Sequence, residues 1–111
     1  MKNTLHSLLD RSDIFRILDD KIAIGKEEKH QIAVLIIQIS RLREINAEYG
    51  FETGDLILKE ILKRIDDIRR QDDTLGRITG SDFGLILPSL HSVGQAILAA
   101  QKIIKISRKP V

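Results

Sequence analysis

Residues 77–88 read RITGSDFGLILP, and this stretch decides the fold. Two apolar segments flank a polar turn, and Pro88 closes the second segment. Gly80 and Ser81 suit the two central positions of a type II′ turn, because glycine accepts the positive φ needed at the first of them. The pattern predicts a β-hairpin that ends at Pro88, with residues 74–76 as a loop leading into it. Its turn is either an active site or the remains of one.

A helix is predicted before the hairpin, near the start of the chain. Apolar residues recur at intervals of three and four from Ile14 to Ile22, which is the period of an amphipathic helix. Ser12 or Asp10 is available as its N-cap. We expect Gly25 to end this helix.

One more strand and three more helices complete the predicted elements. Residues 32–39, IAVLIIQI, are nearly all apolar, so we expect a strand buried on both faces at the centre of the sheet. A short helix that stops at Gly50 follows, and then a longer helix with Asp55 in its first turn. Ser92 and Gln95 form a capping-box pattern before the last helix.

The order of these elements predicts an α+β fold. A strand, crossover helices, a hairpin and a further helix make the βαββα core of a ferredoxin-like, nucleotide-cyclase-like domain, with an extra N-terminal helix. Its central antiparallel sheet is flanked by helices. We expect residues 1–111 to form a single domain that is incomplete at its C-terminus, where one more strand would finish the sheet.

Composition excludes several classes of protein. The net charge is +2, from 18 basic and 16 acidic residues that are interspersed, so nucleic acid is not an expected partner. There is no cysteine, and His6, His30 and His91 have no second ligand at helical spacing, so we expect surface histidines and no metal site of this kind. The longest apolar run, residues 32–37, is too short to span a membrane. We expect a soluble cytoplasmic domain without membrane insertion.

Three stretches resemble one known family. RITGSDFGLILP resembles the RxGGDEFxxLLP signature of GGDEF domains, the bacterial diguanylate cyclases that join two GTP molecules into cyclic di-GMP. Residues 36–55, IIQISRLREINAEYGFETGD, are similar to that family's DIDxFKxINDxxGHxxGD. Residues 3–15, NTLHSLLDRSDIF, resemble its DxLTGLxNRxxF. The resemblance covers most of the chain from Thr4 to Ile106 and implies a signalling domain with the nucleotide-cyclase fold.

The resemblance also implies that the catalytic chemistry is damaged. In the family, carboxylates at two positions hold the divalent metal ions that position the reacting groups. Gln38 and Ser81 occupy these positions here, and Asp82 is the one acid left on the turn. Thr79 replaces a glycine at which the family's backbone approaches the phosphates. The motif positions are Thr79, Gly80, Ser81, Asp82 and Phe83, and none is a confident catalytic residue; the family's basic phosphate contacts lie beyond Val111.

Residues that match the family's recognition sites are present. Asn46 and Asp55 match its guanine contacts; without the resemblance they would be a solvated helix residue and a first-turn acid. Arg70 and Asp73 match the inhibitory RxxD motif, which binds cyclic di-GMP, and Arg77 matches the arginine between that motif and the hairpin. The alternative for RxxD is a helix end whose arginines face the negative pole of the helix dipole.

Three interpretations remain open. The first is a catalytically inactive or strongly impaired regulatory module that binds cyclic di-GMP through Arg70 and Asp73, or GTP weakly through Asn46 and Asp55. The second is an active cyclase that holds metal through Asp82. The third is a ligand-free dimerisation domain that pairs through the open edge of the strand at 32–39. No cofactor is implied beyond Mg²⁺ accompanying bound GTP, and fused or associated sensor or EAL domains are the further partners that the family implies.

Overall fold

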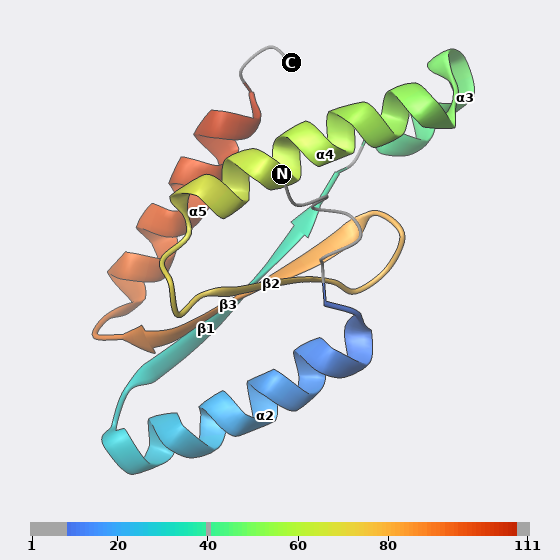
Figure 1. Ribbon diagram of the computed structural model, residues 1–111. Coiled ribbons are helices and arrows are strands. Elements are labelled where there is room, and N and C mark those ends of the chain that lie inside the picture. The colour runs from blue at the N-terminus through green and yellow to red at the C-terminus, as the bar shows by residue number, and fades with distance from the viewer. Residues whose placement is uncertain (1–8, 40, 109–111) are drawn as a thin grey trace.

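The computed structural model describes residues 9–39 and 41–108. His6 and the other residues at 3–8 of the motif at residues 3–15 therefore lie outside the described residues. The elements in chain order are α2 (Arg11–Glu28), β1 (Gln31–Gln38), α3 (Leu42–Tyr49), α4 (Phe51–Ile68), β2 (Thr74–Arg77), β3 (Asp82–Leu90) and α5 (Val93–Ser107). Helix α2 covers one face of the antiparallel sheet, and α4 and α5 cover the other (Figure 1). The predicted α+β class is confirmed.

The strand order differs from the prediction for residues 32–39. The sheet has three strands in the order β1-β3-β2, so β3 lies at the centre and β1 at an edge of the described sheet. Strand β1 is not buried on both faces, because Val34 is 38% and Ile36 63% exposed, whereas residues 83–88 of β3 are all buried. Helix α2 packs mainly against β2 and β3 and leaves this part of β1 uncovered.

The opposite edge of the sheet carries an additional backbone contact. Leu9 makes a parallel bridge with Gly76 of β2, and its carbonyl oxygen accepts a hydrogen bond from the Arg77 N–H at 2.8 Å. The outer edge of β2 is thus partly paired, at Gly76 and Arg77. Among the described residues, β1 is the strand whose outer edge has no partner.

The hairpin is longer on both sides than predicted. Residues 74–76 belong to β2 and not to a loop, and β3 continues past Pro88 to Leu90. Pro88 lies beyond Ile86, the last residue of β3 that is paired with β2, and within a register shift of the β1–β3 pairing. A proline fits inside a strand at such an irregularity, because no ladder hydrogen bond is required of its missing N–H.

Helix α2 begins as predicted and ends later. The Asp10 side chain accepts a hydrogen bond from the backbone N–H of Asp13 at 2.9 Å, which identifies Asp10 as the N-cap. Gly25 does not end the helix, which runs on to Glu28 and is terminated by Lys29 in the left-handed conformation, with φ of 58°. Gly25 is buried, and a Cβ there would lie 3.0 Å from Ile32 Cδ1. The glycine therefore allows close packing of α2 on the start of β1.

Helices α3 and α4 meet at Gly50, whose φ of 91° favours glycine. Because α4 begins directly at Phe51, its first-turn acid is Glu52, and the prediction that Asp55 belongs to the first turn is wrong. Asp55 lies one turn further along, on an exposed part of the helix.

The predicted capping box at the start of α5 does not form, because Gln95 bonds to the residue before the N-cap Ser92. The Ser92 side chain makes no capping hydrogen bond, whereas Gln95 Oε1 accepts from the His91 N–H at 2.6 Å. His91 is exposed, but His30 is half-buried. The two histidine rings lie edge to face with their centroids 5.8 Å apart, although the residues are distant in sequence.

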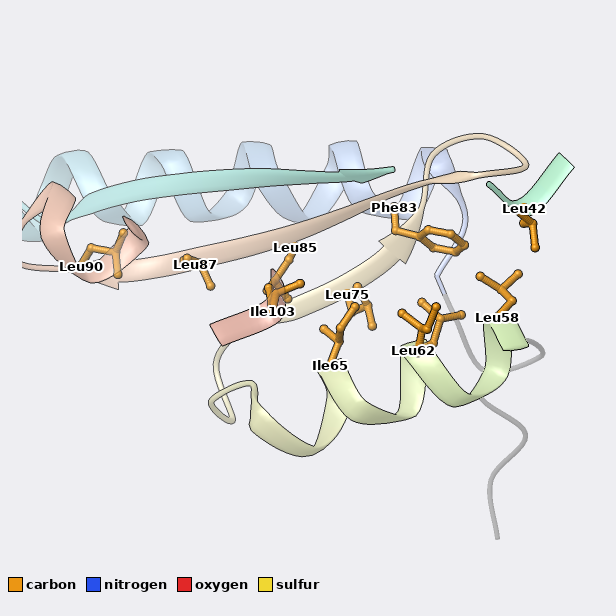
Figure 2. Close-up of a cluster of buried hydrophobic side chains, with 11 residues drawn as sticks. Leu42, Leu58, Leu62, Ile65, Leu75, Phe83, Leu85, Leu87, Leu90 and Ile103 are labelled. Atoms are coloured by element: carbon orange, nitrogen blue, oxygen red, sulfur yellow. The ribbon is translucent and has the colours of Figure 1, made fainter. Parts of the chain in front are cut away.

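The core lies between the sheet and the helices α4 and α5 (Figure 2). Leu62, Ile65 and Phe83 are fully buried in it. The other members of this cluster are Leu42, Leu58, Ile61, Leu75, Leu85, Leu87, Leu90 and Ile103. Phe83 is the one aromatic member, so leucine and isoleucine supply most of the packing, as the low aromatic content predicts. Over the described residues, no helix combines the length and hydropathy needed to cross a membrane.

Candidate functional site

The turn of the hairpin is a tight loop closed on Asp82. The backbone N–H groups of Ile78 and Thr79 both donate to the Asp82 carbonyl oxygen, at 2.9 and 3.1 Å. In return, the Asp82 N–H donates to Thr79 Oγ1 at 3.2 Å. The predicted type II′ turn is wrong, because Gly80 does not have a positive φ. A Cβ at Gly80 would meet nothing within 4 Å, so the turn does not require this glycine.

Arg77 holds the loop in this shape. Its Nη2 donates to the Gly80 carbonyl oxygen at 2.6 Å and its Nε to the Thr79 carbonyl oxygen at 3.2 Å. The guanidinium carbon lies 5.6 Å from the centroid of the Phe83 ring, within the range of a cation–π contact. Arg77 therefore joins the tip of the hairpin to the core.

A cavity of about 700 Å³ lies between this loop and the helices α3 and α4. Asn46 and Asp55, which match the guanine contacts of the family, line it together with the turn. The full set of lining residues is Leu42, Arg43, Asn46, Ala47, Phe51, Asp55, Leu58, Arg77, Thr79, Gly80 and Ser81. Asp82 and Phe83 are not in this set, and Phe83 is a core residue.

Asn46 is fixed in the cavity wall by close packing. A Cβ atom at Gly54 of α4 would overlap the Asn46 side-chain oxygen. This Oδ1 atom is buried and has no hydrogen-bond partner among the described residues. An unpaired buried acceptor is costly, and this oxygen lies against Gly54 in the contact between α3 and α4. Asp55 differs from Asn46, since it is exposed to solvent at the cavity.

The donor set does not fit a divalent metal ion. Gln38 ends β1 opposite Asp82, and the Ser81 backbone oxygen accepts from the Ile39 N–H at 3.1 Å. Neither Gln38 nor Ser81 supplies the anionic oxygen that Mg²⁺ prefers. Within residues 9–39 and 41–108, no group of three or more His, Cys, Asp or Glu side chains is placed to hold a metal ion. Asp82 alone remains, and its Oδ1 is buried without a hydrogen-bond partner among these residues.

Sequence reasoning missed Arg43 as a residue of this cavity. It precedes Asn46 by three residues on α3, and residues at that spacing share a helix face. The spacing of Arg43 from Asn46 could therefore have indicated that both residues face the same site. Arg43 is exposed and lines the cavity, and it makes no hydrogen bond or ion pair with any described residue.

The RxxD residues form a separate turn between α4 and β2. Asp73 is 6% exposed, and its Oδ2 accepts from the Arg70 N–H at 2.9 Å. The Arg70 Nε lies 4.0 Å from the same oxygen, and the Arg70 side chain is 54% exposed. Asp73 Oδ1 is buried and has no hydrogen-bond partner among the described residues. The turn thus leaves a guanidinium facing solvent above a buried carboxylate.

Arg69 braces this turn from the helix side. Its Nη1 donates to the Asp73 carbonyl oxygen at 2.8 Å, and its Nε donates to Asp66 Oδ1 at 2.5 Å. A small cavity of about 200 Å³ beside the turn is lined by Arg69, Arg70 and Asp73, and by Lys102 of α5. Two cationic side chains, Arg69 and Lys102, which sequence reasoning did not single out, therefore lie near Arg70.

The fold, the hairpin and the position of the cavity define a nucleotide-cyclase-like α+β domain. The family model for the diguanylate cyclase GGDEF domain matches residues 3–111. The chain is 32% identical over 109 residues to the diguanylate cyclase TpbB of Pseudomonas aeruginosa, a match that spans 98% of this chain and 25% of that protein. The chain belongs to the GGDEF domain family of diguanylate cyclases, which act in cyclic di-GMP signalling.

Solved structures agree with this assignment. A structure that comprises only the GGDEF domain of TpbB superposes with a TM-score of 0.93 at 32% identity, covering 100% of this chain and 64% of that one. The GGDEF domain of DgcB from Caulobacter crescentus, solved in complex with cyclic di-GMP, superposes with a TM-score of 0.84 at 20% identity, covering 94% of this chain and 61% of that one. This last likeness concerns the fold alone. The chain spans about a quarter of TpbB and less than two thirds of each of these two solved domains.

Proposed function

We propose that this chain is a catalytically inactive or strongly impaired GGDEF domain that works as a receptor module in cyclic di-GMP signalling. In this proposal cyclic di-GMP binds at Arg70 and Asp73, and GTP binds weakly at Asn46 and Asp55. The observation that carries the proposal is a contrast between two sets of residues. The metal positions hold the neutral side chains of Gln38 and Ser81. The residues that match the recognition contacts are present and line two cavities.

The geometry of the RxxD turn supports the choice of ligand. A guanidinium binds a phosphate or the edge of a guanine through two parallel hydrogen bonds, and cyclic di-GMP carries both groups. Arg70 is half exposed, and Asp73 holds the backbone beneath it. The GGDEF domain of DgcB has been solved with cyclic di-GMP, which shows that a domain of this fold takes the ligand.

The deciding experiment is a calorimetric titration of cyclic di-GMP into the native protein and into an Arg70→Ala variant. We expect binding by the native protein and at least a tenfold weaker affinity in the variant, because a charge-assisted hydrogen bond contributes roughly 1.5–3 kcal/mol. Arg16→Ala is the matched control, since Arg16 is an exposed arginine of α2 that pairs with Asp13. An equal loss in both variants would remove the RxxD site from the proposal.

A second candidate function is a ligand-free dimerisation domain. The exposed edge of β1 favours it, since Val34 and Ile36 are exposed there and the strand carries no charged residue. An uncharged apolar edge invites pairing with another chain. Absence of heat with both cyclic di-GMP and GTP, together with concentration-dependent sedimentation, would favour this function over the receptor. The third candidate, an active cyclase, depends on Asp82 as the metal ligand.

The cellular location and the partner domains in this proposal are those that the family implies. The domain acts in the cytoplasm, as one domain over residues 1–111, fused to or associated with sensor or EAL domains.

A further inference from the structure

We propose that the cavity between the hairpin and helices α3 and α4 binds the phosphates of GTP directly through arginine side chains, without a divalent metal ion. This inference rests on the GTP-binding part of the proposed function. It arises from a mismatch, since a site of this family implies a metal and the donor set here does not fit one. The side chains that line the cavity offer another way to neutralise the phosphates.

The charges at the cavity are mainly positive. Arg43 and Arg77 line it, and Asp55 is the one carboxylate among its lining residues. Arg43 has no carboxylate partner among the described residues. The two side-chain hydrogen bonds of Arg77 go to backbone carbonyl oxygens, which leave its formal charge unneutralised. Two guanidiniums against one exposed carboxylate make a site that attracts phosphate.

The same charges oppose a bound metal ion. Mg²⁺ is normally held by one or two carboxylates together with the phosphates of a substrate. Gln38 and Ser81 are neutral, and Asp82, although close in sequence to the turn, does not line the cavity. Two guanidiniums would repel a divalent cation. The residues that line this cavity therefore do not provide a binding site for Mg²⁺.

Arginine can neutralise the phosphate charge that a metal ion would otherwise neutralise. A guanidinium is always charged and presents a planar fork of donors that matches phosphate geometry. Arg43 and Asn46 lie three residues apart on α3 and line the same cavity. Asn46 is therefore on the same side of the helix as Arg43, and a side-chain amide can pair with the edge of a guanine. A nucleotide with its base at Asn46 and its phosphates toward Arg43 and Arg77 would pair with the amide and with both cations.

The test is a titration of GTP into the native protein in two buffers of equal ionic strength, one with EDTA and one with Mg²⁺. We expect binding with EDTA to be at least as tight as with Mg²⁺, because the ion competes with the guanidiniums for the phosphates. Raising the salt concentration should weaken binding in EDTA, since exposed charges are screened. Binding that is seen with Mg²⁺ and lost with EDTA would overturn the inference and leave the GTP-binding part of the proposed function intact.

Arg43 and Arg41 lie two residues apart and give a matched pair of variants. Arg43→Ala should weaken GTP binding in EDTA by about tenfold, the loss of one charge-assisted contact. Arg41→Ala should leave it unchanged, because Arg41 pairs with Glu44 at 3.4 Å and does not line the cavity. Equal effects of the two substitutions would overturn the role of Arg43. Arg77 is left intact, since its removal would also release the hairpin loop.

A carboxylate placed in the cavity should reverse the metal preference. In the variant Ser81→Asp, whose position lines the cavity, GTP should bind more tightly with Mg²⁺ than with EDTA. The same preference in the native protein would contradict the inference. No GTP binding by the native protein in either buffer would overturn both this inference and the GTP-binding part of the proposed function. A cyclic di-GMP titration of the same sample distinguishes that result from failure of the receptor proposal as a whole.

Discussion

At Gly54 the packing of α3 on α4 leaves no space for a side chain. A methyl group there would overlap the Asn46 side-chain oxygen. Gly54→Ala should lower the free energy of unfolding by about 1–3 kcal/mol, the usual cost of overpacking, although alanine alone favours a helix by roughly 1 kcal/mol over glycine. Urea denaturation followed by circular dichroism measures the change.

Gly80→Ala is the control for this prediction. Nothing lies within 4 Å of a Cβ at Gly80, and its φ is not positive, so we expect a change within about 0.5 kcal/mol. Adding Asn46→Ala to Gly54→Ala should recover most of the loss, because the overlapping atom is then removed. An equal loss in both glycine variants would contradict the geometry of the helix pair.

Asp73 stabilises the turn that carries Arg70. Its Oδ2 accepts from the Arg70 N–H, and Asp73→Ala leaves that donor without its partner. We expect a loss of about 1–3 kcal/mol in the free energy of unfolding, measured by urea denaturation. Asp72→Ala is the comparison, because the neighbouring Asp72 is exposed and should change stability by less than about 0.5 kcal/mol. If the two substitutions have the same effect, the buried carboxylate has no structural role.

Among the elements, those with strong local patterns were predicted from the sequence. The apolar period of three and four in α2 and α4 and the paired apolar runs of the hairpin are local signals, and both helices and the hairpin are present. The predicted position of residues 32–39 at the centre of the sheet was wrong, since β1 lies at an edge. Residues 32–39 and 83–87 are both mainly apolar, and which one becomes central depends on pairing and on helix cover, which are not local properties.

The candidate site was predictable in its residue types and not in its shape. The neutral residues Gln38 and Ser81 could be read directly from the sequence. The shape of the turn could not, because Arg77 and Asp82 fix it through hydrogen bonds, and the expected positive φ at Gly80 is absent. The place of Arg43 in the cavity wall likewise depends on how α3 packs beside the hairpin.

The exposed edge of β1 leads to a prediction about association. The Ile39 N–H bonds to Ser81 of the β3 segment, so in an antiparallel pair the polar backbone groups of Val34 and Ile36 point away from β3. Sedimentation velocity of the native protein should show dimers that increase with concentration. Ile36→Lys should shift the population to monomer, because a lysine on an edge strand opposes pairing.

Ile24→Lys is the matched control for this measurement. Ile24 is 46% exposed, but it lies on helix α2 and not on the sheet edge. This substitution should leave the sedimentation profile unchanged. A native protein that stays monomeric over the whole concentration range would sink the dimer proposal, and a shift caused equally by both lysines would mean that general apolar contact drives association.

Cyclase activity is a property of the whole molecule, because two GTP molecules must be joined. We expect no cyclic di-GMP from the native protein incubated with GTP and either Mg²⁺ or Mn²⁺, measured by chromatography of the products. The physical reason is the absence of metal-holding carboxylates at Gln38 and Ser81, since each such contact contributes on the order of several kcal/mol to transition-state stabilisation. Product that disappears in an Asp82→Asn variant would instead establish the active cyclase.

The strand order also has a consequence for how the chain is synthesised. β1 leaves the ribosome before α3 and α4, yet the strand that it pairs with, β3, follows both helices. Until β3 emerges, the apolar side chains of β1 have no sheet to join, and pairing between segments so distant in sequence closes slowly. The nascent chain therefore exposes an aggregation-prone segment until β3 has been synthesised. We expect co-translational chaperones to bind at residues 31–38 and to release once Leu90 has cleared the exit tunnel.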